Sequence, residues 1–355
     1  MENLTIIDRS ELILITGSNG FIGTRVVETL VRYGFHRLRC FVRLSSNVSA
    51  LINIINSCDR NHTTIEIFKG NLLSVEDCRK AVQEVSVVYH LAAGRGEKSY
   101  PDAYMNSVLT TRNLLEAVGK NKNFKRFVNV SSFAVYSNVK TRWGGVLDES
   151  CELEDQPHLR GEAYCYAKVR QDEMVMDYGK KQGIPFVIVR PGVVYGPGNK
   201  GITGRVGIGT FGLFLHLGGS NLIPLTYVDN CAEAIVLAGI RKGVDGEAFN
   251  VVDDHLPTSR ELLKMYKKNV SHFRSIYIPH GINYFLCYLW EKYSDWSKGQ
   301  LPPVFNRKKY YSYWKSNRYP NAKLKNVLGW VPRVPFQEAS RCYFEYQRKV
   351  GAKND

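Results

Sequence analysis

A short apolar strand, a glycine turn and an amphipathic helix follow one another near the N-terminus, and this order constrains the fold more than any other feature. LILIT at 12–16 is apolar and β-rich, and Gly17, Gly20 and Gly23 follow it. Glycines let backbone N–H groups approach a pyrophosphate closely, and the N-terminus of the next helix adds a favourable dipole. The segment predicts the first βαβ unit of a dinucleotide-binding domain. The predicted turn residues that contact the cofactor are Gly17, Asn19, Gly20, Phe21, Ile22 and Gly23.

A second glycine string, at residues 207–212, matches the same type of motif. Gly207, Gly209 and Gly212 satisfy the spacing GxGxxG, which is common by chance. They follow a stretch rich in glycine and proline, without a run of β-forming residues before them. Because a dinucleotide-binding turn must follow a strand, we predict that this copy lies in a loop and binds no cofactor.

Short apolar runs alternate with helical patterns through the first half of the chain, which is typical of a parallel sheet covered on both faces. After Pro191 glycine and proline become frequent, and the later residues are aromatic, basic and mostly helical in pattern. We predict an α/β protein with a Rossmann-type doubly wound parallel sheet and a smaller, mostly helical C-terminal substrate domain. The expected NAD(P)-binding domain is 1–190, the substrate-binding region is 191–355, and 224–252 packs back onto the first domain. The apolar runs assigned to strands are 12–16, 38–42, 64–70, 87–93, 126–132, 185–191 and 249–252.

The chain carries a formal net charge of +15, and residues 301–355 contain twelve Lys or Arg against three Asp or Glu. Such a region suits an anionic substrate or a lipid surface, and no nucleic-acid-binding motif accompanies it. We expect an anionic small-molecule substrate and no nucleic acid as partner; a peripheral membrane contact and a homodimer stay open. The aromatic run at 281–296 suits ordinary helix packing better than an apolar pocket or a membrane surface.

Neither a secretory signal nor a run of 18 apolar residues is present in the sequence, so we expect a cytoplasmic protein. The eight cysteines are scattered, and none forms a CxxC pair. We therefore expect no metal site and reduced, partly buried thiols.

Tyr164 and Lys168 lie four residues apart in a segment of helical pattern. Residues at this spacing share one face of a helix, so the Lys168 ammonium can lie beside the Tyr164 phenol. A neighbouring cation favours the ionised phenol and lowers its pKa from about 10 toward neutrality, where acid–base groups work best. Tyr311 and Lys315 repeat the spacing without any other signal. The first pair, read with Ser132 and the glycine turn, predicts a site of hydride transfer.

Several motifs in order make the chain resemble the extended short-chain dehydrogenase/reductases, the NAD-dependent epimerase/dehydratase family. Some of them also resemble its 3β-hydroxysteroid dehydrogenase-like branch. The resemblance covers nearly the whole chain and implies NAD(P)-dependent hydride transfer at a CH–OH or C=O centre. The motifs are TGSNGFIG, HLAAG, Asn106 in MNSVLTTRNLLEA, VSSFAVY, YCYAK, RPGVVYGPG, YVDN and LGWVPRVPF.

Carried over by motif, the resemblance makes Ser132, Tyr164 and Lys168 the catalytic residues. Tyr164 would be the general acid or base, and Lys168 would hold the nicotinamide ribose and lower the pKa of the phenol. Ser132 would hydrogen-bond the same substrate oxygen. Ser131 is the alternative serine. Tyr166 is the alternative tyrosine, but it lies two residues from Lys168 and would point away from it on a helix.

The end of the second predicted strand indicates the choice of cofactor. No acidic residue lies between positions 28 and 59, where an NAD-binding fold usually carries one for the ribose 2′-OH. Arg43 and the serines after it suit a 2′-phosphate, so we expect NADP rather than NAD. Asn71 stands at the position where relatives commonly carry an Asp that contacts the adenine, and an amide can serve there. Asn106 would have a supporting role at the site. Beyond the turn, the predicted cofactor set is Arg43, Asn71, Leu72, Ala92, Ala93, Asn106, Tyr164, Lys168, Pro191 and Val193, and we predict no metal ligand.

The substrate follows less directly from the resemblance. Members that dehydrate nucleotide sugars carry an Asp-Glu pair after the serine, where this chain has Phe133 and Ala134, so a 4,6-dehydratase is not expected. We expect a nucleotide-sugar epimerase or reductase. The alternative is a hydroxysteroid- or dihydroflavonol-type oxidoreductase on a hydrophobic alcohol or ketone, and a non-catalytic nucleotide sensor is a third option. Nucleotide-sugar relatives often have an arginine before the YVDD-like segment; this chain lacks it, so phosphate contacts would come from Arg205, Arg307, Lys315 or Arg318.

Overall fold

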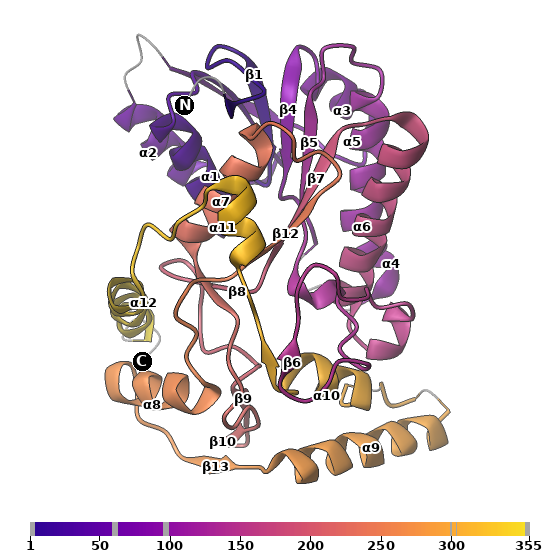
Figure 1. The fold of residues 1–355 in the computed structure, drawn as a ribbon, viewed down its shortest axis with the longest axis vertical. Coiled ribbons are helices and arrows are strands. Elements are labelled where there is room, and N and C mark those ends of the chain that lie inside the picture. The colour runs from indigo at the N-terminus through magenta and orange to yellow at the C-terminus, as the bar shows by residue number, and fades with distance from the viewer. Residues whose placement is uncertain (1–3, 59–62, 95–98, 299, 303, 352–355) are drawn as a thin grey trace.

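A seven-stranded parallel sheet forms the centre of the computed structural model, which describes residues 4–58, 63–94, 99–298, 300–302 and 304–351 (Figure 1). The strand order is β12-β7-β5-β4-β1-β2-β3. The order therefore reverses between β1 and β4, as in a doubly wound Rossmann-type fold, and the predicted fold class is confirmed. The strands are β1 (Leu12–Thr16), β2 (Arg37–Val42), β3 (Thr64–Lys69), β4 (Val85–His90), β5 (Arg126–Val130), β7 (Phe186–Pro191) and β12 (Ala248–Val251).

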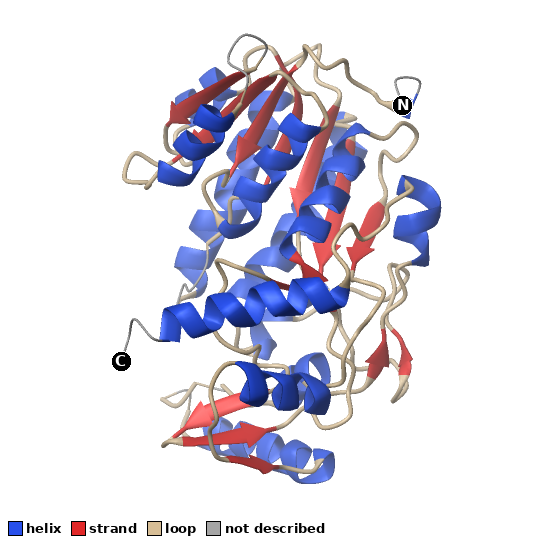
Figure 2. Ribbon diagram, turned by 90° about the vertical axis from the view of Figure 1, so that its left-hand side faces the viewer, coloured by secondary structure: helices blue, strands red, loops and turns tan. Residues whose placement is uncertain are grey.

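Helices cover both faces of this sheet, because β1, β4 and β5 bury every side chain and need an apolar layer on each side (Figure 2). On one face Val26, Leu30 and Ile235 belong to the larger core cluster, and on the other face Leu114 and Val175 belong to the second. The helices of the first face are α1 (Phe21–Arg32), α2 (Ser49–Ser57), α7 (Val228–Ile240) and α11 (Ala322–Leu328). The second face carries α3 (Val75–Ala81), α5 (Thr110–Val118) and α6 (Ala163–Gln182), with α4 (Tyr100–Ala103) and the π-helical turn η2 (Tyr104–Leu109) leading into α5.

Segments from the second half of the chain return to the large sheet. β12 pairs with β7, and α7 is buried along almost its whole length against the sheet. Trp330, which follows α11, is fully buried in the same core. The large sheet thus draws on residues far beyond 190.

The remaining elements form a smaller unit below the carboxyl ends of the strands (Figure 1). We call residues 205–217 and 272–315 the distal lobe, because they form the end of the molecule away from the N-terminus. Its elements are β9 (Gly207–Thr210), β10 (Leu213–His216), β13 (Ser275–Tyr277), α9 (His280–Trp296) and α10 (Arg307–Tyr313). The other elements are η3 (Phe133–Val135), β6 (Gly145–Val146), η4 (Pro157–Arg160), β8 (Val193–Tyr195), β11 (Leu225–Tyr227), α8 (Ser259–Asn269), β14 (Asn317–Arg318) and α12 (Phe336–Gly351). Among the described helices, none combines the length and apolarity needed to cross a bilayer.

The second glycine string differs from its prediction as a loop. Gly207 and Gly209 lie in β9, which pairs antiparallel with β10. The strand escaped the sequence pattern because glycine carries no side chain that would mark a strand; the apolar residues of β10 and the cross-strand backbone hydrogen bonds define it instead. The string forms a β-hairpin and contributes no residue to the cavity described next.

Candidate active site

A cavity of about 620 Å³ opens at the carboxyl ends of the strands of the large sheet. Loops after β1, β2, β3, β4, β5 and β7 all contribute to it, which is the usual ligand position in an open α/β sheet. Every residue predicted above for catalysis or cofactor binding lines this one cavity. Lining residues that the sequence did not reveal include Phe41, Val42, Thr110, Val130 and Asn199.

The glycine turn after β1 packs closely against the start of α1. Gly17 has a φ of +68°, a backbone conformation that residues with a side chain rarely adopt. A Cβ atom on Gly23 would lie only 2.1 Å from the carbonyl oxygen of Gly17. Gly20, the N-cap residue of α1, has no side chain that could accept from the first N–H groups, and the first turn holds no acidic residue. The first N–H groups of this helix therefore suit the pyrophosphate of a dinucleotide in both hydrogen bonding and charge.

The rim of the cavity after β2 and β3 carries polar side chains. Arg43 is exposed there and lines the cavity together with Ser46. Asn71 lies beyond β3, and its side-chain oxygen accepts a hydrogen bond from the N–H of Leu73 at 3.0 Å. That oxygen already accepts one hydrogen bond, so the NH2 group of Asn71 is the part of its side chain that best suits a ligand.

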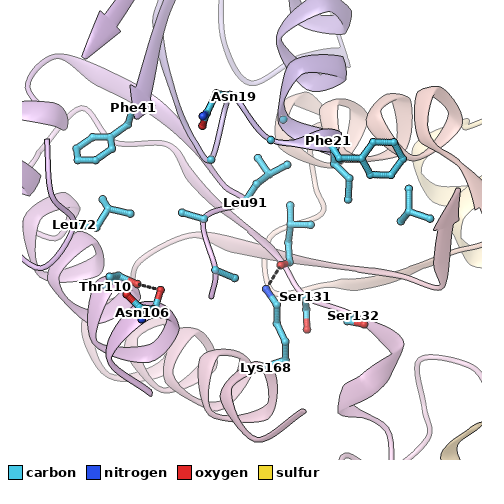
Figure 3. A pocket seen from close by; sticks show the side chains of 18 of the residues that line it. Asn19, Phe21, Phe41, Leu72, Leu91, Asn106, Thr110, Ser131, Ser132 and Lys168 are labelled. Atoms are coloured by element: carbon cyan, nitrogen blue, oxygen red, sulfur yellow. Dashed lines mark hydrogen bonds between the residues drawn. The ribbon is translucent and has the colours of Figure 1, made fainter. Parts of the chain in front are cut away.

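Lys168 points from α6 into the cavity and donates a hydrogen bond to the carbonyl oxygen of Val130 at 2.8 Å (Figure 3). Burial lowers the pKa of its ammonium to about 8, although Asp172 one turn further along α6 opposes the shift. Tyr164, one turn earlier, lines the same cavity and is 39% exposed. The helix thus directs both residues of the predicted pair into the cavity.

Ser131 and Ser132 both line the cavity but differ in environment. Ser131 is buried, whereas Ser132 is half-buried and begins the short helix η3, where its oxygen accepts from the N–H of Ala134 at 3.2 Å. The Ser132 hydroxyl therefore keeps its proton available for a ligand oxygen. Tyr166 packs its ring edge-on against Tyr100, with centroids 5.3 Å apart, and it does not line the cavity.

The wall opposite the glycine turn contains a π-helical turn, η2, which ends in the start of α5. Asn106 lies in this turn and lines the cavity, and its carbonyl oxygen accepts from the Thr110 hydroxyl at 3.1 Å (Figure 3). A π-turn widens the helix by one residue and often marks a functional site. It brings Asn106 to the cavity wall.

A buried polar network missed by the sequence analysis supports the floor behind Lys168. The Asp172 carboxylate accepts from Asn129 at 2.9 Å and from Arg190 at 3.1 Å, and Arg190 also donates to the Tyr136 hydroxyl at 3.0 Å. Burial raises the pKa of Asp172, opposed by the Arg190 cation. Because Asp172 follows Lys168 by four residues, the helical spacing was a usable signal.

His90 anchors a second buried network at the end of β4. Its ring nitrogens lie 2.8 Å from the Thr16 hydroxyl and 2.9 Å from the Thr111 hydroxyl, and Gln171 also donates to Thr111 at 2.7 Å. Burial, followed by the nearby Lys168 cation, lowers the pKa of His90 to about 3. The ring is therefore neutral at ordinary pH and ties β1, β4, α5 and α6 together below the cavity.

The cations proposed from sequence for phosphate binding make other contacts. Arg205 donates to the Ser312 carbonyl at 2.8 Å, and Arg307 pairs with Glu291 through two nitrogens at 2.8 and 3.1 Å. Lys315 donates to the carbonyl oxygens of residues 138, 139 and 141. Arg318 donates to the Gly144 carbonyl at 3.2 Å. All four hold the distal lobe or its borders together, and none of them lines the cavity.

Comparisons with known proteins identify the family of the chain. Residues 13–251 match the model of the NAD dependent epimerase/dehydratase family, and the chain belongs to this family. An Arabidopsis thaliana 3beta-hydroxysteroid-dehydrogenase/decarboxylase is 26% identical over 92% of this chain, which spans 60% of that protein. A trifunctional Arabidopsis UDP-glucose 4,6-dehydratase/epimerase/reductase is 28% identical over 67% of this chain and 36% of its own length. The structure of UDP-glucuronic acid 4-epimerase from Bacillus cereus in complex with NAD has a TM-score of 0.69 and 20% identity, covering 96% of this chain and 99% of that chain.

Proposed function

We propose that the protein catalyses NAD(P)-dependent hydride transfer at a secondary alcohol or ketone, with Ser132, Tyr164 and Lys168 as its catalytic residues. The observation that carries the proposal is the convergence of these three side chains with the glycine turn and the α1 N-terminus on one cavity. A nucleotide sensor would not require the tyrosine and lysine to meet there, so an enzyme is the better account.

The nicotinamide, when bound, supplies or accepts the hydride. Tyr164 gives a proton to the substrate oxygen during reduction and takes it back during oxidation. Ser132 donates a second hydrogen bond to the same oxygen and stabilises the charge that develops on it. Lys168 would hold the cofactor ribose, and its ammonium, with a pKa of about 8, would supply the positive charge that favours the ionised phenol of Tyr164.

Dehydration of a nucleotide sugar is outside the proposed activity, although one relative carries a dehydratase in its name. The ring of Phe133 is buried edge-on against Tyr136, with centroids 5.8 Å apart. Ala134 uses its N–H and its carbonyl to hold Ser132 and Arg160. Neither side chain can transfer a proton, so elimination of water has no acid–base pair at these two positions.

Two observations favour a hydrophobic alcohol or ketone as the substrate. The four cations available for a diphosphate are already bound to carbonyl groups or to Glu291. The hydroxysteroid relative aligns with 92% of this chain, including the substrate-binding half, whereas the nucleotide-sugar relative aligns with 67%. A nucleotide-sugar epimerase is the second candidate, favoured by the net charge of +15 and by the likeness to solved epimerases.

The proposed cofactor preference is NADP over NAD, because Arg43 and Ser46 lie at the rim where the ribose 2′ position is expected and the loop after β2 has no acid. Arg43→Ala should lower NADP affinity roughly tenfold and leave NAD affinity nearly unchanged. An equal loss of affinity for NADP and NAD in Arg43→Ala, or tighter binding of NAD than of NADP by the wild-type protein, would contradict the proposed preference for NADP.

One experiment tests the proposed reaction and its substrate together. The purified protein is incubated with NAD or NADP and either steroid-like alcohols or UDP-sugars, and reduced cofactor is followed by its absorbance. We expect stoichiometric reduced cofactor with an uncharged alcohol and no reaction with UDP-sugars. Interconversion of two UDP-sugars without net cofactor reduction would establish the second candidate, and no turnover of either class would reject the enzyme proposal.

A further inference from the structure

Helix α9 has two apolar faces, and only one of them packs on the protein. Asn283, Cys287 and Ser294 are buried on the inner face, which contacts the cluster of Leu217, Tyr310 and Trp314. A second set of large apolar side chains on the same helix is exposed. These residues are Ile282, Phe285, Leu286, Leu289, Tyr293 and Trp296.

The exposed set forms a single stripe. At about 100° per residue its members fall within a sector of roughly 100°, whose centre lies about 130° from the buried face. The helix has 17 residues and is about 26 Å long. An apolar stripe of this length on an outer helix marks an interaction surface.

Trp143 and Trp296 place an indole ring near each end of the helix. Trp143 is exposed, and its ring lies edge-on to His280, the first residue of α9, with centroids 5.0 Å apart. Trp296 closes the helix with 76% of its surface exposed. Tryptophan is enriched where a protein meets the interface between lipid and water.

The hairpin of β9 and β10 adds an exposed aromatic residue to the distal lobe. Phe211 and Gly212 form its two-residue loop with φ values of +46° and +75°, the pattern of a type I′ turn. A bulky residue at positive φ is strained, and this position favours Asn, Asp or Gly. Phe211 is nevertheless fully exposed at the tip. The turn thus keeps a strained backbone at Phe211 and leaves its aromatic ring in solvent, next to the small sheet that packs on α9.

Basic residues accompany the apolar ones. Residues 260–300 contain seven Lys or Arg against three Asp or Glu. Arg142, Arg274, Lys292 and Lys298 are exposed close in sequence to the stripe or its tryptophans. Of the two acids on α9, Glu291 pairs with Arg307, and Asp295 lies about 130° from the centre of the stripe. On α9 itself Lys292 lies about 70° from the centre of the stripe and borders it, whereas both acids of the helix lie on other sides.

We propose that the distal lobe binds the surface of an anionic phospholipid bilayer, with α9 lying in the plane of the interface. The combination of a long apolar stripe, tryptophans near both ends and bordering cations is that of an interfacial helix. Anionic headgroups attract each nearby Lys or Arg and explain why charge and apolar surface occur together. A second copy of this chain would place like charges against each other and is the less suited occupant. The proposal does not depend on the proposed reaction, since α9 contributes no residue to the active-site cavity.

Vesicle flotation of the full chain tests the proposal. Vesicles of phosphatidylcholine alone are compared with vesicles of phosphatidylcholine and phosphatidylserine, at low and high salt. The wild-type protein should float with the anionic vesicles, and added salt should weaken its binding. Phe285→Glu/Leu289→Glu should lower binding at least about tenfold. Val331→Glu, at a residue 67% exposed and next to the buried Trp330 of the large-sheet core, is the matched control and should bind like wild type.

Three outcomes would overturn the proposal: no flotation of the wild-type protein, equal binding to both vesicle types, or unchanged binding of the double variant. Light scattering of the same proteins distinguishes the other occupant. If wild type is a dimer and the double variant a monomer, a second copy of the chain covers the stripe and the membrane proposal fails. Circular dichroism and melting temperature confirm that the variants fold. Flotation needs no turnover, so its result stands apart from the test of the proposed reaction.

Discussion

The cavity at the large sheet and the distal lobe use the same kinds of residue in different ways. Both contain a glycine string and a tyrosine four residues before a lysine. In α6, a helix of 20 residues, Tyr164 and Lys168 are both helical and both line the cavity. The helix α10 ends at Tyr313, so Lys315 lies outside it; its ammonium lies 5.0 Å from the centre of the Tyr311 ring and binds three carbonyl groups.

This contrast shows that a tyrosine four residues before a lysine predicts a catalytic pair only where one continuous helix directs both side chains into the same cavity. In the large sheet the strand ends collect the polar residues at a single edge. In the distal lobe Arg205, Arg307 and Lys315 hold loops together, and the surface left for a partner combines apolar side chains with other, exposed cations. Substitutions in the two regions test this division.

Tyr164→Phe should reduce turnover by roughly two to four orders of magnitude, because it removes the proton-transfer group. Cofactor affinity and melting temperature should stay close to those of wild type, since the hydroxyl lies at a cavity and the ring is retained. Steady-state kinetics and cofactor titration check both parts. Tyr166→Phe is the control on the same helix and should keep nearly full turnover; near-normal turnover in Tyr164→Phe would rule out its role.

Gly23→Ala should cost about 3 kcal/mol or more of unfolding free energy and weaken cofactor binding, because the new Cβ would meet the Gly17 carbonyl at 2.1 Å. Gly209→Ala is the matched change in the second glycine string. A Cβ there meets nothing within 4 Å, so this variant should stay within about 0.5 kcal/mol of wild type. Chemical denaturation and cofactor titration of the two variants measure the contrast, and similar effects at both sites would contradict it.

Lys168→Met should remove a pH dependence of stability that Lys168 gives the wild-type protein. Burial lowers the folded-state pKa of Lys168 to about 8 from its ordinary 10.5, so the charged form costs folding free energy below pH 8. That cost, on the order of 3 kcal/mol at most, disappears as pH rises from 8 to 10.5. The stability of wild type relative to Lys168→Met should therefore increase over this range. Urea unfolding of both cofactor-free proteins at several pH values checks the slope, and a flat difference would mean that the buried ammonium costs little.

The sequence predicted the parts of the site that depend on local backbone geometry. The glycine turn, the strand ends and the Tyr164–Lys168 helix each follow from a motif within a few residues, and all of them reach one cavity. The contacts of Lys315 with residues 138–141 span more than 170 positions, so no local pattern reveals them. The π-turn at Asn106 has no periodic signal, because one inserted residue changes the helix only where tertiary packing holds it.

Phe211→Asn should have a small effect on folding, opposite in sign to that of Gly23→Ala. Asn adopts positive φ more readily than Phe and is favoured at this position of a type I′ turn, so unfolding free energy should rise by about 0.5–1 kcal/mol. Because the Phe211 ring is fully exposed, its removal should cost little packing energy. The same variant should bind anionic vesicles less well, because the tip loses its apolar ring. A stabilised variant with weaker vesicle binding would show that the hairpin trades stability for a surface contact. If Asn destabilises the fold instead, Phe211 has a structural role, and the hairpin drops out of the membrane surface while α9 stays under test.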